Sequence, residues 1–306
     1  MGSGHDHGHD AGRAEDRSRL RVVLLVTLTV AVVELVGAFL SGSLALFADA
    51  GHMFTDTAAI VVALSASYVA TLPASSRRTF GYHRAEILAA LINSVVLLGV
   101  CGYLAYAGVA RLLDPVEIDA SQMLVFAVVG LLANLVSIAL LAARRDQSLN
   151  MRGAFLEVLG DAFGSAAAIV SGLVVLTTGF QRADPIASLV IAVLILPRAW
   201  SLLRACVGVL LEAAPPGVDM DVVRRHLAGA EGVIDVHDLH AWQITNGMPA
   251  LSAHITVTDH ALESRGVGQI LDELSECVAS HFGIDHVTFQ VEPGSHQGHE
   301  PGKAHR

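Results

Sequence analysis

Two pairs of side chains that can bind metal stand out in an otherwise apolar sequence. The first pair is His52 and Asp56 in ADAGHMFTD, and the second is Glu157 and Asp161 in FLEVLGD. Residues four apart lie on one face of an α-helix. If the two helices cross, one imidazole nitrogen and three carboxylates converge, and this donor set suits a divalent transition metal such as Zn²⁺.

A further acid, Asp49, precedes His52 by one helical turn, so Asp49, His52 and Asp56 share a helical face. Ionisable side chains at membrane depth are costly, and they usually face a polar cavity and serve function. The three acids of the two pairs, Asp56, Glu157 and Asp161, would repel one another in a dry core, which favours a metal site over a purely structural contact. We expect Asp49 either to orient the ligands or to line the entrance to the site.

These residues lie in segments built mainly of Ala, Val, Leu and Ile. Hydrophobic residues make up 53% of the 306 residues and charged residues only 16%, whereas a soluble domain carries about 25% charge. A membrane-spanning helix needs about 20 mostly apolar residues. Six segments qualify, which predicts an α-helical membrane protein with a six-helix transmembrane domain over residues 20–210. They are residues 22–41, 44–72, 87–110, 121–143, 153–180 and 185–208.

Arginine is concentrated in alternate connections between these segments. It recurs within residues 13–21, 77–84 and 144–152, while the other connections hold only Arg111 and Arg182. Because basic residues stay on the cytoplasmic side, this asymmetry predicts that both termini are cytoplasmic. No secretory signal is evident, and we expect a multi-pass protein of a bacterial inner membrane. Arg198 and Arg204, near the end of the sixth segment, are expected to reach the membrane interface.

The composition changes at about residue 211, where EAAPPGVDM predicts a break. The patterns that follow predict a helix, two strands, a second helix and a third strand, which is the order αββαβ of a small cytoplasmic α+β domain over residues 211–293. A His-rich cytoplasmic tail (1–19) precedes the first span, and a disordered, His-containing tail (294–306) ends the chain. The predicted elements are residues 219–229, 237–245, 250–258, 262–281 and 286–292.

Histidines also occur on each of the three predicted strands. His237 and His240 lie on the first, His254 on the second, and His286 on the third, which ends at Glu292. Single strand histidines are usually ordinary polar residues, but one or more on every strand of a small sheet is less expected. The motif HDHGHD at residues 5–10 is open to two interpretations, a loose cytoplasmic collector of metal or a plain polar tail.

Four separated motifs together resemble the cation diffusion facilitator family of zinc and related metal transporters. They are ADAGHMFTD, FGYHRAEILAALIN (80–93), RGAFLEVLGDAFGS (152–165) and HDLHAWQI, and the resemblance covers residues 20–292 in order. It implies six spans, a ferredoxin-like cytoplasmic domain and a homodimer. In that family an HxxxD motif on the second span and another on the fifth bind the transported metal. His52, Asp56 and Asp161 match these motifs, and Glu157 replaces a histidine.

The resemblance implies export of divalent cations from the cytoplasm in exchange for protons. Zn²⁺ is the expected ion, and the Glu157 carboxylate, a harder ligand than imidazole, adds Cd²⁺, Co²⁺, Fe²⁺ or Mn²⁺ as further candidates. Close acids share protons, so the empty site is expected to hold at least one and to release it as metal binds. A regulatory metal site in the cytoplasmic domain is also implied, at His237, His254 and Glu292 and, with less support, at His240 and His286.

Other classes of protein are less well supported. An intramembrane metal-dependent enzyme needs a motif such as HExxH, which does not occur, so no catalytic activity is expected. A metal-permeable channel or sensor stays open as an alternative, although direct ligands favour occlusion over fast permeation. No GxxxxGK[ST] loop and no basic footprint occur, and the net charge is −10. We therefore expect no organic cofactor and no nucleic-acid partner; the expected partners are metal ions, protons and lipid.

Overall fold

The structure is a computed structural model that describes the backbone of residues 7–143 and 149–296 and the side chains of residues 20–143 and 151–296. It divides into two compact units. The first combines Met1–Leu64 with Ile92–Leu203, and the second combines Ser65–Leu91 with Arg204–Arg306. The predicted tail 294–306 falls largely outside the described residues, as do the histidine side chains at residues 5–9.

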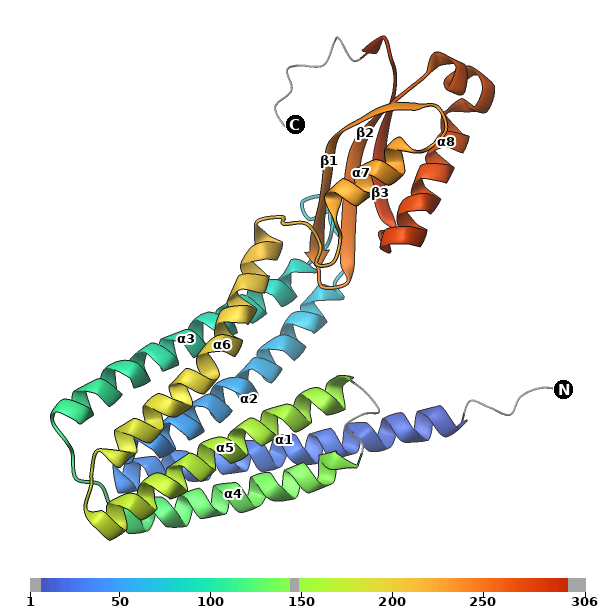
Figure 1. The fold of residues 1–306 in the computed structure, drawn as a ribbon. Coiled ribbons are helices and arrows are strands. Elements are labelled where there is room, and N and C mark those ends of the chain that lie inside the picture. The colour runs from blue at the N-terminus through green and yellow to red at the C-terminus, as the bar shows by residue number, and fades with distance from the viewer. Residues whose placement is uncertain (1–6, 144–148, 297–306) are drawn as a thin grey trace. The chain divides into compact units, whose positions relative to one another are not determined.

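Six long helices account for the apolar segments (Figure 1). Each contains a stretch that is long and apolar enough to cross a membrane. The first begins well before its apolar stretch, so residues 7–19 continue it as helix. The helices are α1 (His7–Ser41), α2 (Leu44–Ala70), α3 (Arg84–Leu113), α4 (Ala120–Ala142), α5 (Leu149–Thr178) and α6 (Ala183–Leu210).

Helices α1, α4 and α5 pack against one another, and Figure 1 shows them side by side. Small residues allow this close approach: a Cβ atom at Gly37 on α1 would lie 2.3 Å from the Phe126 ring on α4. Many large apolar side chains point outward, among them Phe39, Tyr106 and Val193. Apolar surface on this scale is what a lipid-facing bundle requires.

A buried carboxylate fixes the start of α2. Asp184, in the first turn of α6, accepts hydrogen bonds from Ser43 Oγ (2.6 Å), the Leu44 backbone N–H (2.8 Å) and the Ala45 backbone N–H (3.1 Å). These amides are among the donors that an α-helix leaves unpaired at its N-terminus. One side chain therefore carries out the capping of α2 from a helix 140 residues away, and its charge is favourable there.

The C-terminal domain has the predicted order αββαβ. Its elements are α7 (Met220–Ala228), β1 (Val233–Thr245), β2 (Met248–Val257), α8 (Asp259–Phe282) and β3 (His286–Pro293). The sheet order is β1-β2-β3, with β1 antiparallel and β3 parallel to β2.

One face of this sheet packs against both helices. Leu251, Ala253 and Ile255 on β2 form a core with residues of α7 and α8. Side chains alternate along a strand, so His254 lies on the opposite face. A bulge between His237 and His240, with Asp238 at φ 45°, breaks the alternation on β1. The outer face of the sheet is thus left free to present polar groups.

Candidate metal sites

Helices α2 and α5 bring three of the four predicted transport ligands together inside the membrane domain. His52 Nε2 lies 3.6 Å from Asp56 Oδ2 on its own helix and 3.9 Å from Asp161 Oδ1 on α5. All three side chains are buried, with exposures of 9%, 7% and 2%. Neither His52 Nδ1 nor Asp161 Oδ1 has a hydrogen-bond partner among the described residues. Buried polar atoms are normally paired, so these two are poised to bind something else.

The fourth predicted ligand, Glu157, is joined to the others through an arginine. Arg198 on α6 directs Nη1 to Asp56 Oδ2 at 3.4 Å and Nη2 to Glu157 Oε1 at 3.6 Å. The guanidinium group therefore bridges two of the acids. The side chain is still 55% exposed, so it keeps contact with the surroundings while it neutralises part of the site.

A cavity of about 620 Å³ leads to these acids. Its walls come from residues 20–27 of α1, 53–64 of α2 and 153–161 of α5, and Asp56, Glu157 and Asp161 line it together. Arg21 also lines it, and the remaining lining is mainly apolar. The three carboxylates therefore face one cavity along the first half of α5.

Asp49 belongs to a second polar cluster rather than to the contacts of His52. Ser165 Oγ on α5 lies 2.9 Å from Asp49 Oδ2 and 3.2 Å from Glu34 Oε1 on α1. Asn134 on α4 donates from Nδ2 to the same hydroxyl at 3.4 Å. Asn134 thus links α4 to α5 through an interhelical hydrogen bond. Glu34 was not predicted to have a role, although an acid inside a span is itself a signal of function.

Glycines make room for the two acids of this cluster. A Cβ atom at Gly130 on α4 would lie 1.8 Å from Glu34 Oε1, and one at Gly164 on α5 would lie 2.2 Å from Asp49 Oδ1. Any side chain at either position would displace the carboxylate that faces it. The interior is therefore shaped around Glu34 and Asp49, and both are fully buried.

In the C-terminal domain, His237, His254 and Glu292 come from three different strands and meet on one face of the sheet. Among the described residues they form the single group of three or more such side chains whose ligand atoms all lie within 4.8 Å of one another. His237 pairs with His254 across β1 and β2, with ring centroids 5.3 Å apart. His254 Nδ1 lies 3.2 Å from Glu292 Oε1, and Glu292 is buried. Two imidazoles and a carboxylate suit Zn²⁺.

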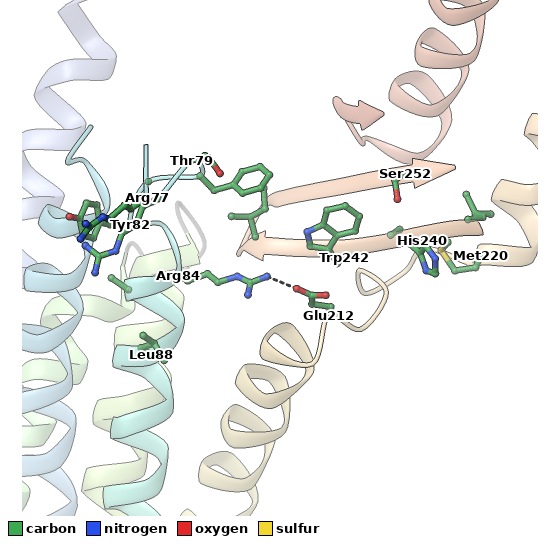
Figure 2. A pocket seen from close by; sticks show the side chains of 17 residues that line it. Arg77, Thr79, Tyr82, Arg84, Leu88, Glu212, Met220, His240, Trp242 and Ser252 are labelled. Carbon is green, nitrogen blue, oxygen red and sulfur yellow. Dashed lines mark hydrogen bonds and ion pairs between the residues drawn. The ribbon is translucent and has the colours of Figure 1, made fainter. Parts of the chain in front are cut away.

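The two other predicted strand histidines lie apart from this group. His240 lines a separate cavity of about 1050 Å³ with Trp242 and Ser252 (Figure 2). His286, at the start of β3, packs its ring against Phe80 with centroids 5.6 Å apart. Strand membership alone could not separate these residues from His237 and His254, because the bulge on β1 decides where His240 lies.

The second unit contains two further features, an ion pair and a buried cysteine. Arg84 Nη2, at the start of α3, pairs with Glu212 Oε1, just after α6, at 3.1 Å (Figure 2). Burial raises the pKa of the Cys277 thiol on α8, so the sulfur stays protonated at neutral pH.

Comparison with known proteins identifies the family. Residues 20–211 match the cation efflux transmembrane domain, and residues 215–294 match the cation efflux protein, cytoplasmic domain. The chain therefore belongs to the cation efflux family, also called the cation diffusion facilitators, as the four motifs predicted. Members of this family are transporters.

Among its relatives is the metal cation efflux system protein CzcD of Cupriavidus metallidurans, 41% identical over 292 residues, or 95% of this chain and 90% of that protein. Zinc transporter ZitB of Escherichia coli is 39% identical over 272 residues, or 87% of this chain and 84% of that protein. The cadmium, cobalt and zinc/H(+)-K(+) antiporter of Bacillus subtilis is 38% identical over 267 residues, with coverages of 87% and 85%. The chain is a multi-pass integral membrane protein of metal cation efflux.

Proposed function

We propose that this protein exports Zn²⁺ from the cytoplasm in exchange for protons, with His52, Asp56, Glu157 and Asp161 as the ligands of the transported ion. The observation that carries the proposal is the contact of His52 with acids on two helices, beside a cavity that reaches the same acids. Two motifs a hundred residues apart in sequence meet there, and both have unpaired buried atoms that a cation would satisfy.

The charge of the site supports a divalent cargo. Three ionised acids would give −3, and Arg198 offsets one of these charges in the arrangement described above. A bound divalent ion would then leave the group nearly neutral, which a buried site in a membrane requires. Carboxylate oxygen at Glu157 admits harder ions than an imidazole would, so Cd²⁺, Co²⁺, Fe²⁺ and Mn²⁺ are proposed as weaker substrates.

Two further observations support the proposed direction of metal transport and its coupling to a second ion. The arginine-rich connections favour cytoplasmic termini, so the cavity between the first halves of α1 and α5 would open to the cytoplasm. A relative of this chain carries the name H(+)-K(+) antiporter, which favours ion exchange over a channel. A bacterial inner membrane is the proposed location.

The C-terminal domain is proposed to bind a regulatory metal at His237, His254 and Glu292 and to mediate a homodimer. The convergence of the three side chains within 4.8 Å supports the metal site. Since each ligand comes from a different strand, a bound metal ion would hold the three strands of the sheet together. We leave His240 and His286 out of the proposed site because neither belongs to this group.

Metal flux in proteoliposomes tests the proposal. The native protein should accumulate Zn²⁺ inside the vesicles against its concentration gradient when protons flow outward down theirs. His52→Ala should abolish this uptake. Glu117→Gln, an exposed acid between α3 and α4, is the matched control and should transport normally. A zinc flux that does not saturate with concentration and does not depend on the pH gradient would indicate a channel instead.

A further inference from the structure

A pair of buried carboxyls lies one helical turn away from the proposed transport ligands. Glu34 on α1 and Asp49 on α2 have exposures of 0% and 1%, and Ser165 on α5 lies between them. Asn134 on α4 completes the cluster, so four helices contribute to it. Among residues 20–143 and 151–296 neither acid forms an ion pair with an arginine, lysine or histidine. Two ionised carboxylates without a counter-cation would be very unfavourable here.

Counting hydrogens on Ser165 shows that the cluster needs an additional proton. A serine hydroxyl carries one hydrogen and two lone pairs. Its oxygen already accepts from Asn134 Nδ2, so it can donate to either Glu34 Oε1 or Asp49 Oδ2 but not to both. The remaining contact is a hydrogen bond only if that carboxyl is protonated and donates its own O–H to Ser165.

Unpaired atoms in the same cluster give an independent indication. Glu34 Oε2 and Asn134 Oδ1 are buried, and neither has a partner among the described residues. Asn134 is fully buried, and its amide is held in the cluster through Ser165. The O–H of a protonated carboxyl could serve only one acceptor at a time, the Ser165 hydroxyl oxygen or an amide oxygen such as that of Asn134. The glycines at positions 130 and 164 provide the room that the two carboxyls occupy.

We propose that Glu34 and Asp49 form the site that carries the counter-transported proton, separate from the metal ligands. This inference rests on the proposed exchange of metal for protons and adds where the proton is held. Among the described residues, the charged or titratable groups nearest the pair are Asp161 on α5, one turn before Ser165, and His52 on α2, one turn after Asp49. Within the described part of α4, the contact to the cluster comes from the neutral Asn134.

This placement gives a direct coupling between the two ions. With the metal site empty, no cation opposes a proton on the pair. When a divalent cation binds at His52 and Asp161, its positive charge opposes that proton. The carboxylic O–H then ionises, the proton leaves to water as H⁺, and a carboxylate remains. Release of the metal restores the affinity for a proton, which completes the exchange.

Glu34→Gln and Asp49→Asn test the site, because each amide imitates the protonated acid and can still donate to Ser165. Both variants should fold and keep zinc-for-zinc exchange across proteoliposomes within about twofold of the native rate, while uptake driven by a pH gradient falls by about tenfold or more. Glu117→Gln should change neither quantity. Infrared difference spectra should show a carboxylic acid band that responds to zinc in the native protein and weakens in both variants.

The outcomes separate this inference from the proposed function. If the native protein shows no dependence on a pH gradient, the exchange itself fails and this inference with it. If the native protein depends on the gradient and both amide variants keep that dependence, only the proton site is overturned. A variant that fails to fold leaves the native infrared spectrum as the test, and absence of a zinc-sensitive carboxylic acid band would overturn the proposal. A zinc ion bound at Glu34 and Asp49 would overturn it as well.

Discussion

The family pattern on the fifth span is an HxxxD motif. In this chain Glu157 stands at the position of its histidine. Its carboxylate lines the cavity with Asp56 and Asp161, and its Oε1 atom contacts Arg198. Imidazole favours zinc more than carboxylate does, so the ligand at this position should tune selectivity.

We expect Glu157→His to raise the zinc-to-manganese ratio of transport by roughly tenfold. The rate for zinc itself should change less, because one imidazole replaces one oxygen ligand. Metal-specific uptake into proteoliposomes measures the ratio, and Glu117→His is the control. Unchanged selectivity and affinity would mean that Glu157 is not a ligand.

Arg198 supplies a second prediction at the scale of a residue. Its guanidinium contacts Asp56 and Glu157, which are two of the proposed ligands. Arg198→Gln removes this positive charge and should tighten binding of Zn²⁺ about fivefold, since a partly exposed pair contributes at most about 1 kcal/mol. Titration calorimetry on the purified protein measures the affinity. The control is Arg182→Gln, directly before α6, whose side chain donates to the Leu112 carbonyl. Weaker binding in Arg198→Gln would contradict the prediction.

Among the helices, the junction of α2 and α6 depends on Asp184. Its carboxylate accepts from Ser43 Oγ and from two backbone amides at the start of α2. Asp184→Ala leaves these buried donors without an acceptor, which should lower the free energy of unfolding by about 2–4 kcal/mol. Thermal unfolding in detergent measures the loss.

Asp119 offers the matched comparison for this cap. It accepts from the Ser121 and Gln122 amides at the start of α4, but it is exposed. Asp119→Ala should therefore cost only about 1 kcal/mol. An equal loss in the free energy of unfolding for the two variants would mean that the buried cap at Asp184 stabilises the protein no more than the exposed cap at Asp119.

The sequence predicted the elements well because each has a local signal. Apolar stretches of about 20 residues mark the spans, and alternation with turn residues marks the strands, so six helices and the order αββαβ are confirmed. The spacing of His52 and Asp56, and of Glu157 and Asp161, likewise places each pair on one face of its helix.

Partners from other helices could not be predicted in the same way. Spacing within a helix says nothing about how a neighbouring helix is rotated, and Glu34 and Arg198 contact the sites from α1 and α6. The same holds for Asp49, which faces Ser165. In the sheet, the bulge at Asp238 decided that His237, and not His240, lies beside His254.

For the whole molecule, the group on the three strands predicts that zinc stabilises the C-terminal domain. A ligand that binds only the folded state stabilises it by about 2.7 kcal/mol at a concentration of 100 times its Kd. Hydrogen exchange of β1, β2 and β3 should slow on adding zinc, and His254→Ala should remove the effect. A His52→Ala background excludes the transport site, and His286→Ala is the control, since it lies outside the group. Equal protection in His254→Ala would rule out zinc binding there.

Arg198 has a consequence for the transport cycle as a whole. If Asp56 and Glu157 bind the cargo as proposed, the guanidinium tethered beside them is an intramolecular competitor of that cargo, and its effective concentration does not depend on how much metal is present. An exporter that bound its ion too tightly would stall with the ion in place. A competitor built into the chain lowers the affinity equally for every divalent ion, so it speeds release without altering which ion is preferred.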